Sequence, residues 1–545
     1  MKMKKYIIHR LFMKAVFTIV AVFALNSCTD DFTEYNTNKT QMMAVGPKEL
    51  AGLFSRALYE GCTWLTTDNM SRMSSTAALH FCGYTACGIT NQEVLIMNPG
   101  WQNTGFNKMF ASVIPPLNSI MDVSKDGVNT AAYNVALIWK VWILNRLTDI
   151  WGPIPYTEAG NGKDVVPYES QKDIYYKMFE DLTNAVNALN AELKTNPSLK
   201  VFNAGDLIYG GDVSKWVKFA NTLRLRFAIR ISNIDPAKAQ KEAEAAIAGS
   251  LMETNADDAL LTTSVLTSGG NGMCRMESFY QDIMSASMES VLKGYSDPRM
   301  EEYFSPVAYN SVIDAAGYPA VLKAQVGGYH GMANGYEPIQ INYFKSYSKY
   351  GPRFKDGKQL VTPINIINSA ETYFLKAEGA WRGWNMGGTA QSFYEKGIEI
   401  SIKQWRGTSF SSASITSYIN GTTTPIAPDN YPYYDPAMTN IPVKFSSDKT
   451  AQYEQIMTQK WLALFPVSFE AWAEYRRTRL PKIYAKKYSA NALVNPAIGQ
   501  IVTRFPYTTD EKNTQPAEIT KAIELLGGVD LETTPLWWDV NKNGN

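Results

Sequence analysis

The chain has 545 residues, enough for about three domains, although single domains of this length are common. Its formal net charge is +1 at pH 7, so the chain does not have the excess of basic residues that is typical of nucleic-acid-binding proteins. The same near-zero charge argues against electrostatic docking on anionic lipid. The apolar fraction of 45% supports a full hydrophobic core, and 13 Trp, 31 Tyr and 23 Phe supply rings that serve in cores and in binding surfaces.

The first 27 residues have the parts of a secretory signal peptide. A basic leader over residues 2–14 contains no carboxylate, and the apolar run 15–25 follows it. This run is shorter than the roughly 20 apolar residues that cross a bilayer. Leu25-Asn26-Ser27-Cys28 then resembles a bacterial lipobox, in which the Cys is acylated and becomes the mature N-terminus. The alternative is an ordinary secretory peptide with a Cys near its end.

The residues after Cys28 are expected to form a tether. The acidic segment 29–38 resembles the export signal that sends some Gram-negative lipoproteins to the outer face of the outer membrane, and its composition also suits a solvated linker. We therefore expect a signal peptide over 1–27, a lipid anchor and tether over 28–46, and one domain over 47–545.

Helical periodicity dominates the first half of this domain. A helix is expected over 47–60, whereas glycines interrupt the pattern from 61 to 116 and indicate long loops with short helices. Apolar residues at three- to four-residue spacing then predict four helices, over 131–149, 171–193, 213–232 and 236–248. Asp212 is a plausible N-cap, and Asp235 followed by Pro236 marks a clear helix start. Four successive helices joined by short turns indicate an all-α scaffold.

A second helical block follows an aperiodic, Gly- and Tyr-rich stretch over 262–368. Six residues from 374 to 397 fall at the apolar and small positions of a tetratricopeptide hairpin, although Glu378 and Ile402 depart from that pattern. A generic helical hairpin is the alternative. Residues 407–450 read as an irregular insertion, and two more helices follow around Trp461 and Trp472.

Spacing also predicts which side chains of these helices are buried. Four tryptophans at helical spacing are expected in the core: Trp216, Trp381, Trp461 and Trp472. The charged residues around and after Trp472 are expected on a solvated or salt-bridged helix face.

The cysteines and the C-terminus offer no metal motif. Four cysteines remain besides Cys28, namely Cys62, Cys82, Cys87 and Cys274. Because their number is even, they could form one or two disulfides, and buried free thiols are the alternative. The segment 539–544 begins like an EF-hand loop, but the chain ends before the distal Glu. We expect no metal and no cofactor.

One long segment carries a family resemblance. Residues 457–478, Met-Thr-Gln-Lys-Trp-Leu-Ala-Leu-Phe-Pro-Val-Ser-Phe-Glu-Ala-Trp-Ala-Glu-Tyr-Arg-Arg-Thr, resemble the SusD/RagB family of nutrient-binding outer-membrane lipoproteins. Weaker likenesses occur in four further segments, namely 151–156, 206–216, 371–378 and the C-terminal Leu536-Trp537-Trp538-Asp539.

The resemblance implies an all-α fold of tetratricopeptide-like hairpins with an irregular, loop-rich ligand face. It also implies a partner, a SusC-type TonB-dependent barrel in the outer membrane. In that family the lipoprotein caps the barrel as a lid on the cell exterior and delivers oligosaccharides or, in some members, oligopeptides.

Chemistry suggests where a ligand would bind. The C–H face of a sugar packs on an aromatic plane while its hydroxyls need polar partners, and ligand pockets combine both. The two aperiodic stretches supply this mixture, although core packing is the alternative for any single ring. The candidates are Trp64, Tyr84, Trp101, Asn103, Tyr280, Tyr295, Tyr329 and Tyr336.

Other functions remain as alternatives. A glycan-degrading enzyme needs two carboxylates placed across the scissile bond. The spacing of Asp and Glu residues along the sequence cannot exclude such a pair. The chain has only three histidines and neither a His-Glu-x-x-His nor a Gly-x-Ser-x-Gly motif, so we expect no catalysis. An oligopeptide ligand stays open, because the same aromatic residues could form side-chain pockets for it.

Overall fold

Most of the predicted helices are present in the computed structural model. It describes residues 46–62, 80–82, 92–96, 99–264, 270–274, 282–335, 343–355 and 357–541, and the unit from Glu49 to Asn545 is described below. The predicted signal peptide, Cys28 and the predicted tether up to residue 45 lie outside the described residues. None of the helices described is both long and apolar enough to span a bilayer.

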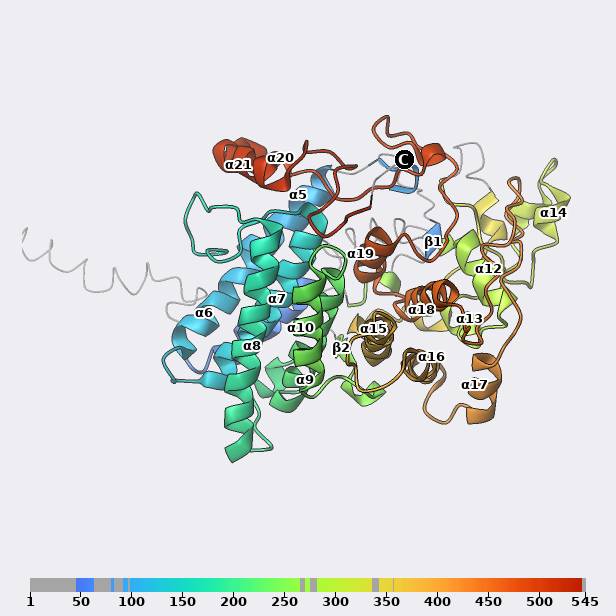
Figure 1. Ribbon diagram of the computed structural model, residues 1–545. Helices are drawn as coiled ribbons and strands as arrows, with labels where there is room; N and C mark the ends of the chain where they lie inside the picture. Colours follow the sequence, from blue (N-terminus) through green and yellow to red (C-terminus); the bar gives the residue numbers. More distant parts are fainter. Residues whose placement is uncertain are drawn as a thin grey trace, which may run out of the picture. The chain divides into compact units, whose positions relative to one another are not determined.

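The first array contains the four expected helices (Figure 1). They are α7 (Thr130–Trp151), α8 (Gln171–Thr195), α9 (Val213–Arg230) and α10 (Pro236–Ile247), and each packs on the next. The side chain of Asp212 accepts a hydrogen bond from the Ser214 N–H, which confirms it as the N-cap of α9. Asp235 caps α10 through the Lys238 N–H, with Pro236 at the start of the helix.

The segment before this array is more helical than predicted. α3 (Leu50–Cys62) agrees with the sequence. α5 (Pro99–Lys108), a π-helical turn (Met109–Val113) and α6 (Ile114–Ser124) form a continuous helical stretch, where long loops with short helices were expected up to residue 116. Pro115 and Pro116 stand in the first turn of α6, where their missing N–H groups cost little. The prolines therefore lie where the π-helical turn passes into α6, and the helical stretch continues through them.

The second array contains α15 (Ser369–Trp381), α16 (Ala390–Arg406), α18 (Lys449–Ala463) and α19 (Ser468–Thr478). α15 packs on α16 and α18, and also on α9 of the first array. A Cβ at Gly397 would lie 2.9 Å from the Phe374 ring, so the small residue lets α16 approach α15 closely. The insertion over 407–450 is irregular apart from one short helix, α17 (Ser412–Ile419).

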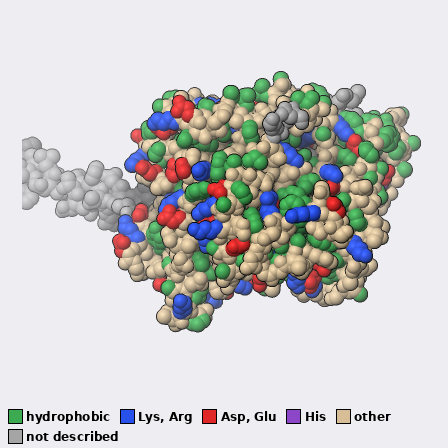
Figure 2. Space-filling model, viewed as in Figure 1, with side chains coloured by type: hydrophobic (Ala, Val, Ile, Leu, Met, Phe, Trp, Pro, Cys, Tyr) green, Lys and Arg blue, Asp and Glu red, His purple; other side chains and the backbone are tan. Residues whose placement is uncertain are grey.

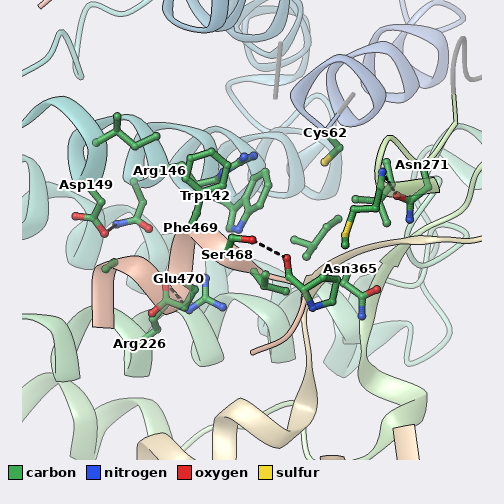
Figure 3. Close-up of a pocket in the computed structure, with 18 of the residues that line it drawn as sticks. Cys62, Trp142, Arg146, Asp149, Arg226, Asn271, Asn365, Ser468, Phe469 and Glu470 are labelled. Carbon is green, nitrogen blue, oxygen red and sulfur yellow. Dashed lines mark hydrogen bonds and ion pairs between the residues drawn. The ribbon is translucent and has the colours of Figure 1, made fainter. Parts of the chain in front are cut away.

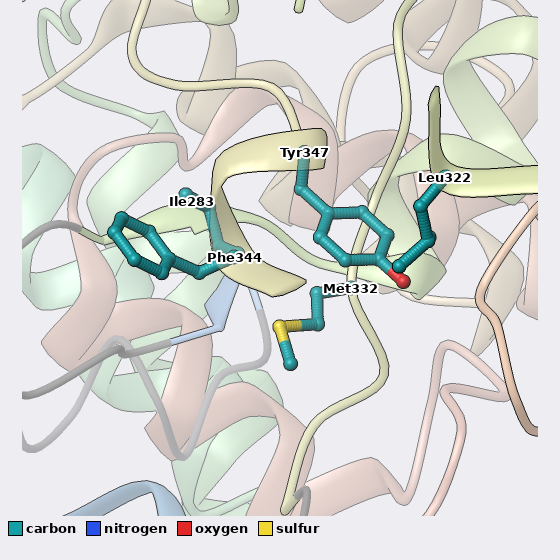
Figure 4. Close-up of a cluster of buried hydrophobic side chains, with 5 residues drawn as sticks. All are labelled: Ile283, Leu322, Met332, Phe344 and Tyr347. Carbon is teal, nitrogen blue, oxygen red and sulfur yellow. The ribbon is translucent and has the colours of Figure 1, made fainter. Parts of the chain in front are cut away.

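The aperiodic stretch 262–368 contains short helices and two short strands, each of which pairs with a strand that lies outside the stretch in the sequence. The helices are α12 (Ala286–Gly294), α13 (Met300–Tyr303) and α14 (Ala320–Lys323), and the strands are β1 (Phe81–Cys82), β2 (Ala259–Leu261), β3 (Ile283–Met284) and β4 (Ile364–Ile367). Antiparallel pairs join β1 to β3 and β2 to β4. Ile283, Leu322, Met332, Phe344 and Tyr347 form the buried cluster of this region (Figure 4).

The C-terminal segment returns to the helical arrays after α20 (Thr509–Thr514) and α21 (Pro516–Leu526). Trp538 is fully buried and donates its indole N–H to Asp149 Oδ1 at 2.8 Å. Asp539 pairs with Arg479 at 3.2 Å, and Asn541 donates to main-chain carbonyls at the end of α19. The residues that resemble the start of an EF-hand loop thus hold the C-terminal segment against α19.

The expected tryptophan core is confirmed at three of four positions. Trp216, Trp461 and Trp472 are buried, whereas Trp381 is half-buried and stacks on Tyr453 with 4.3 Å between ring centroids. Trp381 lies near the end of α15 and its indole N–H donates to the Lys449 carbonyl, so it forms an outer contact between α15 and α18. On the face shown in Figure 2, acidic and basic side chains are interspersed, in keeping with the near-zero net charge.

Candidate functional site

Two of the hollows in the described structure that carry aromatic and polar side chains are candidate ligand sites, and the first lies inside the helical scaffold. This inner cavity is lined by α7, α19, β4 and residues near Asn271 (Figure 3). The Arg146 guanidinium lies between the rings of Trp142 and Phe469, 4.6 and 4.5 Å from their centroids, and donates to the Gly61 carbonyl. The cavity volume is about 90 Å³, well below the ~300–1,000 Å³ typical of ligand pockets.

The charges at the floor of the inner cavity are committed to ion pairs. Arg226 makes a bidentate pair with Glu371 at 2.7 and 2.6 Å, and Arg230 pairs with Glu470 and with Glu474. Burial alone would lower the pKa of Arg226, but Glu371 and Glu470 raise it above its usual value. These groups therefore join α9, α15 and α19 and are not available to a ligand.

The network continues through the α19 charges that the sequence placed on a solvated or salt-bridged face. Glu470, Glu474 and Arg477 are salt-bridged but buried, because α19 packs inside the scaffold. Arg476 is also buried, and it donates to the main-chain carbonyls of Asp149 and Thr503. Arg477 holds Glu378 bidentately at 2.7 and 2.6 Å and Glu474 at 2.7 Å. Burial would raise the pKa of Glu378, but Arg477 and Arg382 outweigh it and hold that pKa at about 2. The solvated interpretation is wrong for these residues.

The second hollow is a groove of about 920 Å³ in the loop-rich region. Its walls come from residues 301–310 and 344–355, together with Tyr329 and Arg406. Phe344 and Tyr347 belong both to the lining and to the buried cluster beneath it, and the Tyr347 hydroxyl donates to the Tyr431 carbonyl at 3.0 Å. The floor of the groove is therefore fixed by packing.

Exposed rings and charged side chains stand above this floor. Tyr309 is 65% exposed, and its hydroxyl donates to Asp314, which raises the pKa of the tyrosine. Tyr329 is half-buried, and burial raises its pKa. Arg406 pairs with Glu301 and Glu302, and three lysines complete the charged lining: Lys345, Lys349 and Lys355. The groove offers both apolar ring faces and hydrogen-bond donors.

Of the four predicted ligand residues that the structure describes, one lines the groove, namely Tyr329. Trp101 and Asn103 lie on α5, which Figure 1 shows well apart from α13, and the Asn103 amide donates to Asp510 of α20 at 3.1 Å. Tyr295 is only 5% exposed and donates its hydroxyl to the Ile441 carbonyl, so we do not include it in the site. The other four lie outside the described residues: Trp64, Tyr84, Tyr280 and Tyr336.

The remaining groove residues were missed by sequence reasoning. Tyr309 and Asn310 follow Pro306 by three and four residues in a loop, and residues 343–350 mix four aromatic residues with Lys and Ser. The segment 343–350 could have been predicted as part of a ligand site, because it mixes aromatic and polar residues within eight positions. Cys62 and Cys274 are buried, whereas the side chains of Cys82 and Cys87 lie outside the description, so the disulfide alternatives stay open.

Comparison with known proteins gives one family. The family model described as SusD-like, SusD and RagB outer membrane lipoprotein, matches residues 36–539. No curated protein sequence matches the chain.

Solved structures agree with this fold over nearly the whole chain. A chitin-binding SusD homologue from Flavobacterium johnsoniae is 30% identical, with a TM-score of 0.78 and coverage of 91% of this chain and 100% of its own. A SusD homologue from Bacteroides ovatus is 27% identical, with the same TM-score and coverage. A SusD-like protein from Bacteroides thetaiotaomicron is 28% identical, with a TM-score of 0.77 and coverage of 91% and 100%.

Proposed function

This chain belongs to the SusD-like family of outer-membrane lipoproteins, and on that premise we propose that it binds an oligosaccharide in the groove beside Tyr329. In this proposal the protein is a binder and not an enzyme, and it passes its ligand as a lid to a SusC-type TonB-dependent barrel. The barrel partner is inferred from family membership. The ligand class is inferred from the side chains that line the groove.

The observation that carries the proposal is the combination of ring faces and polar groups in one open groove of about 920 Å³. The exposed ring of Tyr309 and the half-buried ring of Tyr329 supply apolar surfaces for sugar C–H faces. Lys345 and Lys355 supply donors for hydroxyl oxygens. The chitin-binding homologue from Flavobacterium johnsoniae supports a carbohydrate as the ligand class.

The location proposed for the protein follows from its N-terminus. We propose that Cys28 is acylated and anchors the protein in the outer membrane, facing the cell exterior. One acyl chain holds a protein only weakly, so stable anchoring requires more than one chain on the cysteine.

Isothermal titration of the mature protein with a panel of oligosaccharides, chitooligosaccharides first, tests the proposal. We expect saturable binding to one glycan class and a loss of at least about tenfold in affinity for Tyr329→Ala or Tyr309→Ala, equivalent to about 1.4 kcal/mol. Tyr488→Ala removes an exposed tyrosine that does not line the groove and is the matched control. Trp101→Ala tests the predicted residue on α5.

Three results would change the proposal. Binding that survives both groove variants but is lost in Trp101→Ala would move the site to α5. Saturable binding to a peptide digest and to no glycan would favour the oligopeptide alternative. New reducing ends after incubation with a glycan would make the protein an enzyme.

A further inference from the structure

A cluster of titratable side chains next to the groove is unused by the proposed function. Glu289 of α12, His330 and Asp429 each offer one potential ligand atom, and all three atoms lie within 4.8 Å of one another. His330 Nδ1 lies 3.5 Å from Glu289 Oε1 and 3.2 Å from Asp429 Oδ2. The three residues come from segments far apart in the sequence, so the fold assembles the cluster.

The main chain around the cluster is fixed on every side. Glu289 is fully buried, and its Oε2 accepts the Gly331 N–H at 2.7 Å, which leaves Oε1 to face the cluster. The N–H of His330 donates to Ser348 Oγ at 3.0 Å, and its carbonyl accepts the Ser348 N–H at 2.9 Å. The carbonyl of Asp429 accepts the Gln325 amide at 2.7 Å. Such fixed supporting bonds are typical of metal ligands.

The imidazole of His330 has one ring nitrogen, Nδ1, that could bind a metal ion. His330 Nδ1 is buried and makes no hydrogen bond with any residue that the structure describes, although two carboxylates flank it. Buried polar atoms are normally hydrogen-bonded, so an orphaned nitrogen at such a position needs an explanation. A metal ion bound at this nitrogen is one.

The cluster already attracts a cation of its own. Lys293 Nζ lies 2.7 Å from Glu289 Oε1 and 3.3 Å from Asp429 Oδ2. One ammonium offsets the charge of only one of the two carboxylates. The Lys293 side chain is 24% exposed, and it can swing into water at the end of α12 when a more highly charged ion arrives.

We propose that Glu289, His330 and Asp429 form a binding site for a divalent transition metal ion, with Zn²⁺ the best match. Zn²⁺ binds imidazole and carboxylate at about 2.0–2.2 Å, which places tetrahedral ligands roughly 3.4 Å apart. The separations of 3.5 and 3.2 Å from His330 Nδ1 fit that spacing, and the third separation, between Glu289 and Asp429, is at most 4.8 Å. Water would complete the coordination, and the ion would tie α12 to the segment that carries Tyr329 of the groove.

Zn²⁺ titration of the untagged mature protein tests this site, with Co²⁺ absorption as a second measurement. We expect one saturable site per chain and visible bands of tetrahedral Co²⁺. His330→Ala and Asp429→Asn should each weaken binding at least about tenfold, because each removes one ligand. Lys293→Met should strengthen binding by about tenfold, because it removes the competing ammonium.

Control variants show whether a loss of Zn²⁺ binding comes from the cluster itself. Asp435→Asn changes an acid of the same loop that pairs with Lys487 outside the cluster, and it should leave Zn²⁺ affinity unchanged. Asp429 and Lys293 reach the surface, so their variants should fold, and far-UV circular dichroism checks this. No saturable binding up to about 1 mM Zn²⁺ in wild type and Lys293→Met would overturn the proposal. Binding that persists in His330→Ala would also overturn it.

Discussion

Arg477 occupies a position where a buried cation satisfies two buried anions. Its guanidinium is fully buried and bonds Glu378 and Glu474. Burial would lower the pKa of Arg477, but the two carboxylates raise it well above its usual value. Removing one member of such a group leaves charge that is neither solvated nor paired, and the typical penalty is about 3–5 kcal/mol.

We therefore expect Arg477→Met to lower the free energy of unfolding at pH 7 by about 3–5 kcal/mol, measured by urea denaturation. Lys396→Met breaks an exposed pair with Glu399 on α16 and should cost less than about 1 kcal/mol. A loss below 1 kcal/mol for Arg477→Met would show that the network carries little stability.

The same residues predict how stability depends on pH. The pKa of Glu378 falls from 4.5 to about 2 on folding, so the stabilisation is present above pH 4.5. It is lost as the pH falls through about 2, where the folded protein also takes up the proton. We expect the urea midpoint of the wild type to fall between pH 4.5 and 2, and the Arg477→Met midpoint to fall less over that range. Equal acid dependence in the two proteins would contradict this assignment.

At the scale of elements, the sequence predicted helix boundaries where neighbouring residues determine them. Asp235-Pro236 fixes a helix start through a cap and a preset φ, so the sequence predicted α10 closely. The stretch 99–124 was missed because Gly100, Gly105 and two prolines normally interrupt helices. A π-helical turn and tertiary packing retain the helix there, and neither has a local signal.

The C-terminal segment gives a prediction at this scale. Trp538 is buried against the guanidinium groups of Arg230 and Arg476 and donates to Asp149. Trp538→Ala should lower the free energy of unfolding by about 3–5 kcal/mol through lost apolar contact. Trp538→Phe keeps most of the ring and should cost about 1–2 kcal/mol through the lost hydrogen bond.

Val540→Ala changes an exposed neighbour of Trp538 and should alter the free energy of unfolding by less than about 0.5 kcal/mol. Urea denaturation followed by circular dichroism measures all three variants. If Trp538→Ala were no more destabilising than Val540→Ala, the segment would not dock on α7 and α9 in solution.

At the scale of the whole molecule, the scaffold was more predictable than the candidate site. Helical periodicity repeats over many residues, and it predicted both arrays. A ligand residue depends on which side of a loop it occupies, and sequence does not encode that locally. Tyr295 and Tyr329 are both tyrosines from one aperiodic stretch, yet α12 carries the first into the core and the second lines the groove.

Attachment to the membrane is the last property of the whole molecule to test. Each buried CH₂ of an acyl chain contributes about 0.8 kcal/mol, so a cysteine that carries several chains holds the protein on its membrane. Cells fed an alkyne-bearing palmitate should label the wild-type protein, and Cys28→Ala should carry no label. Cys62→Ala keeps the leader intact and should be labelled like the wild type. Equal labelling of Cys28→Ala would mean that acylation takes place at another residue, and the leader would then be an ordinary secretory peptide.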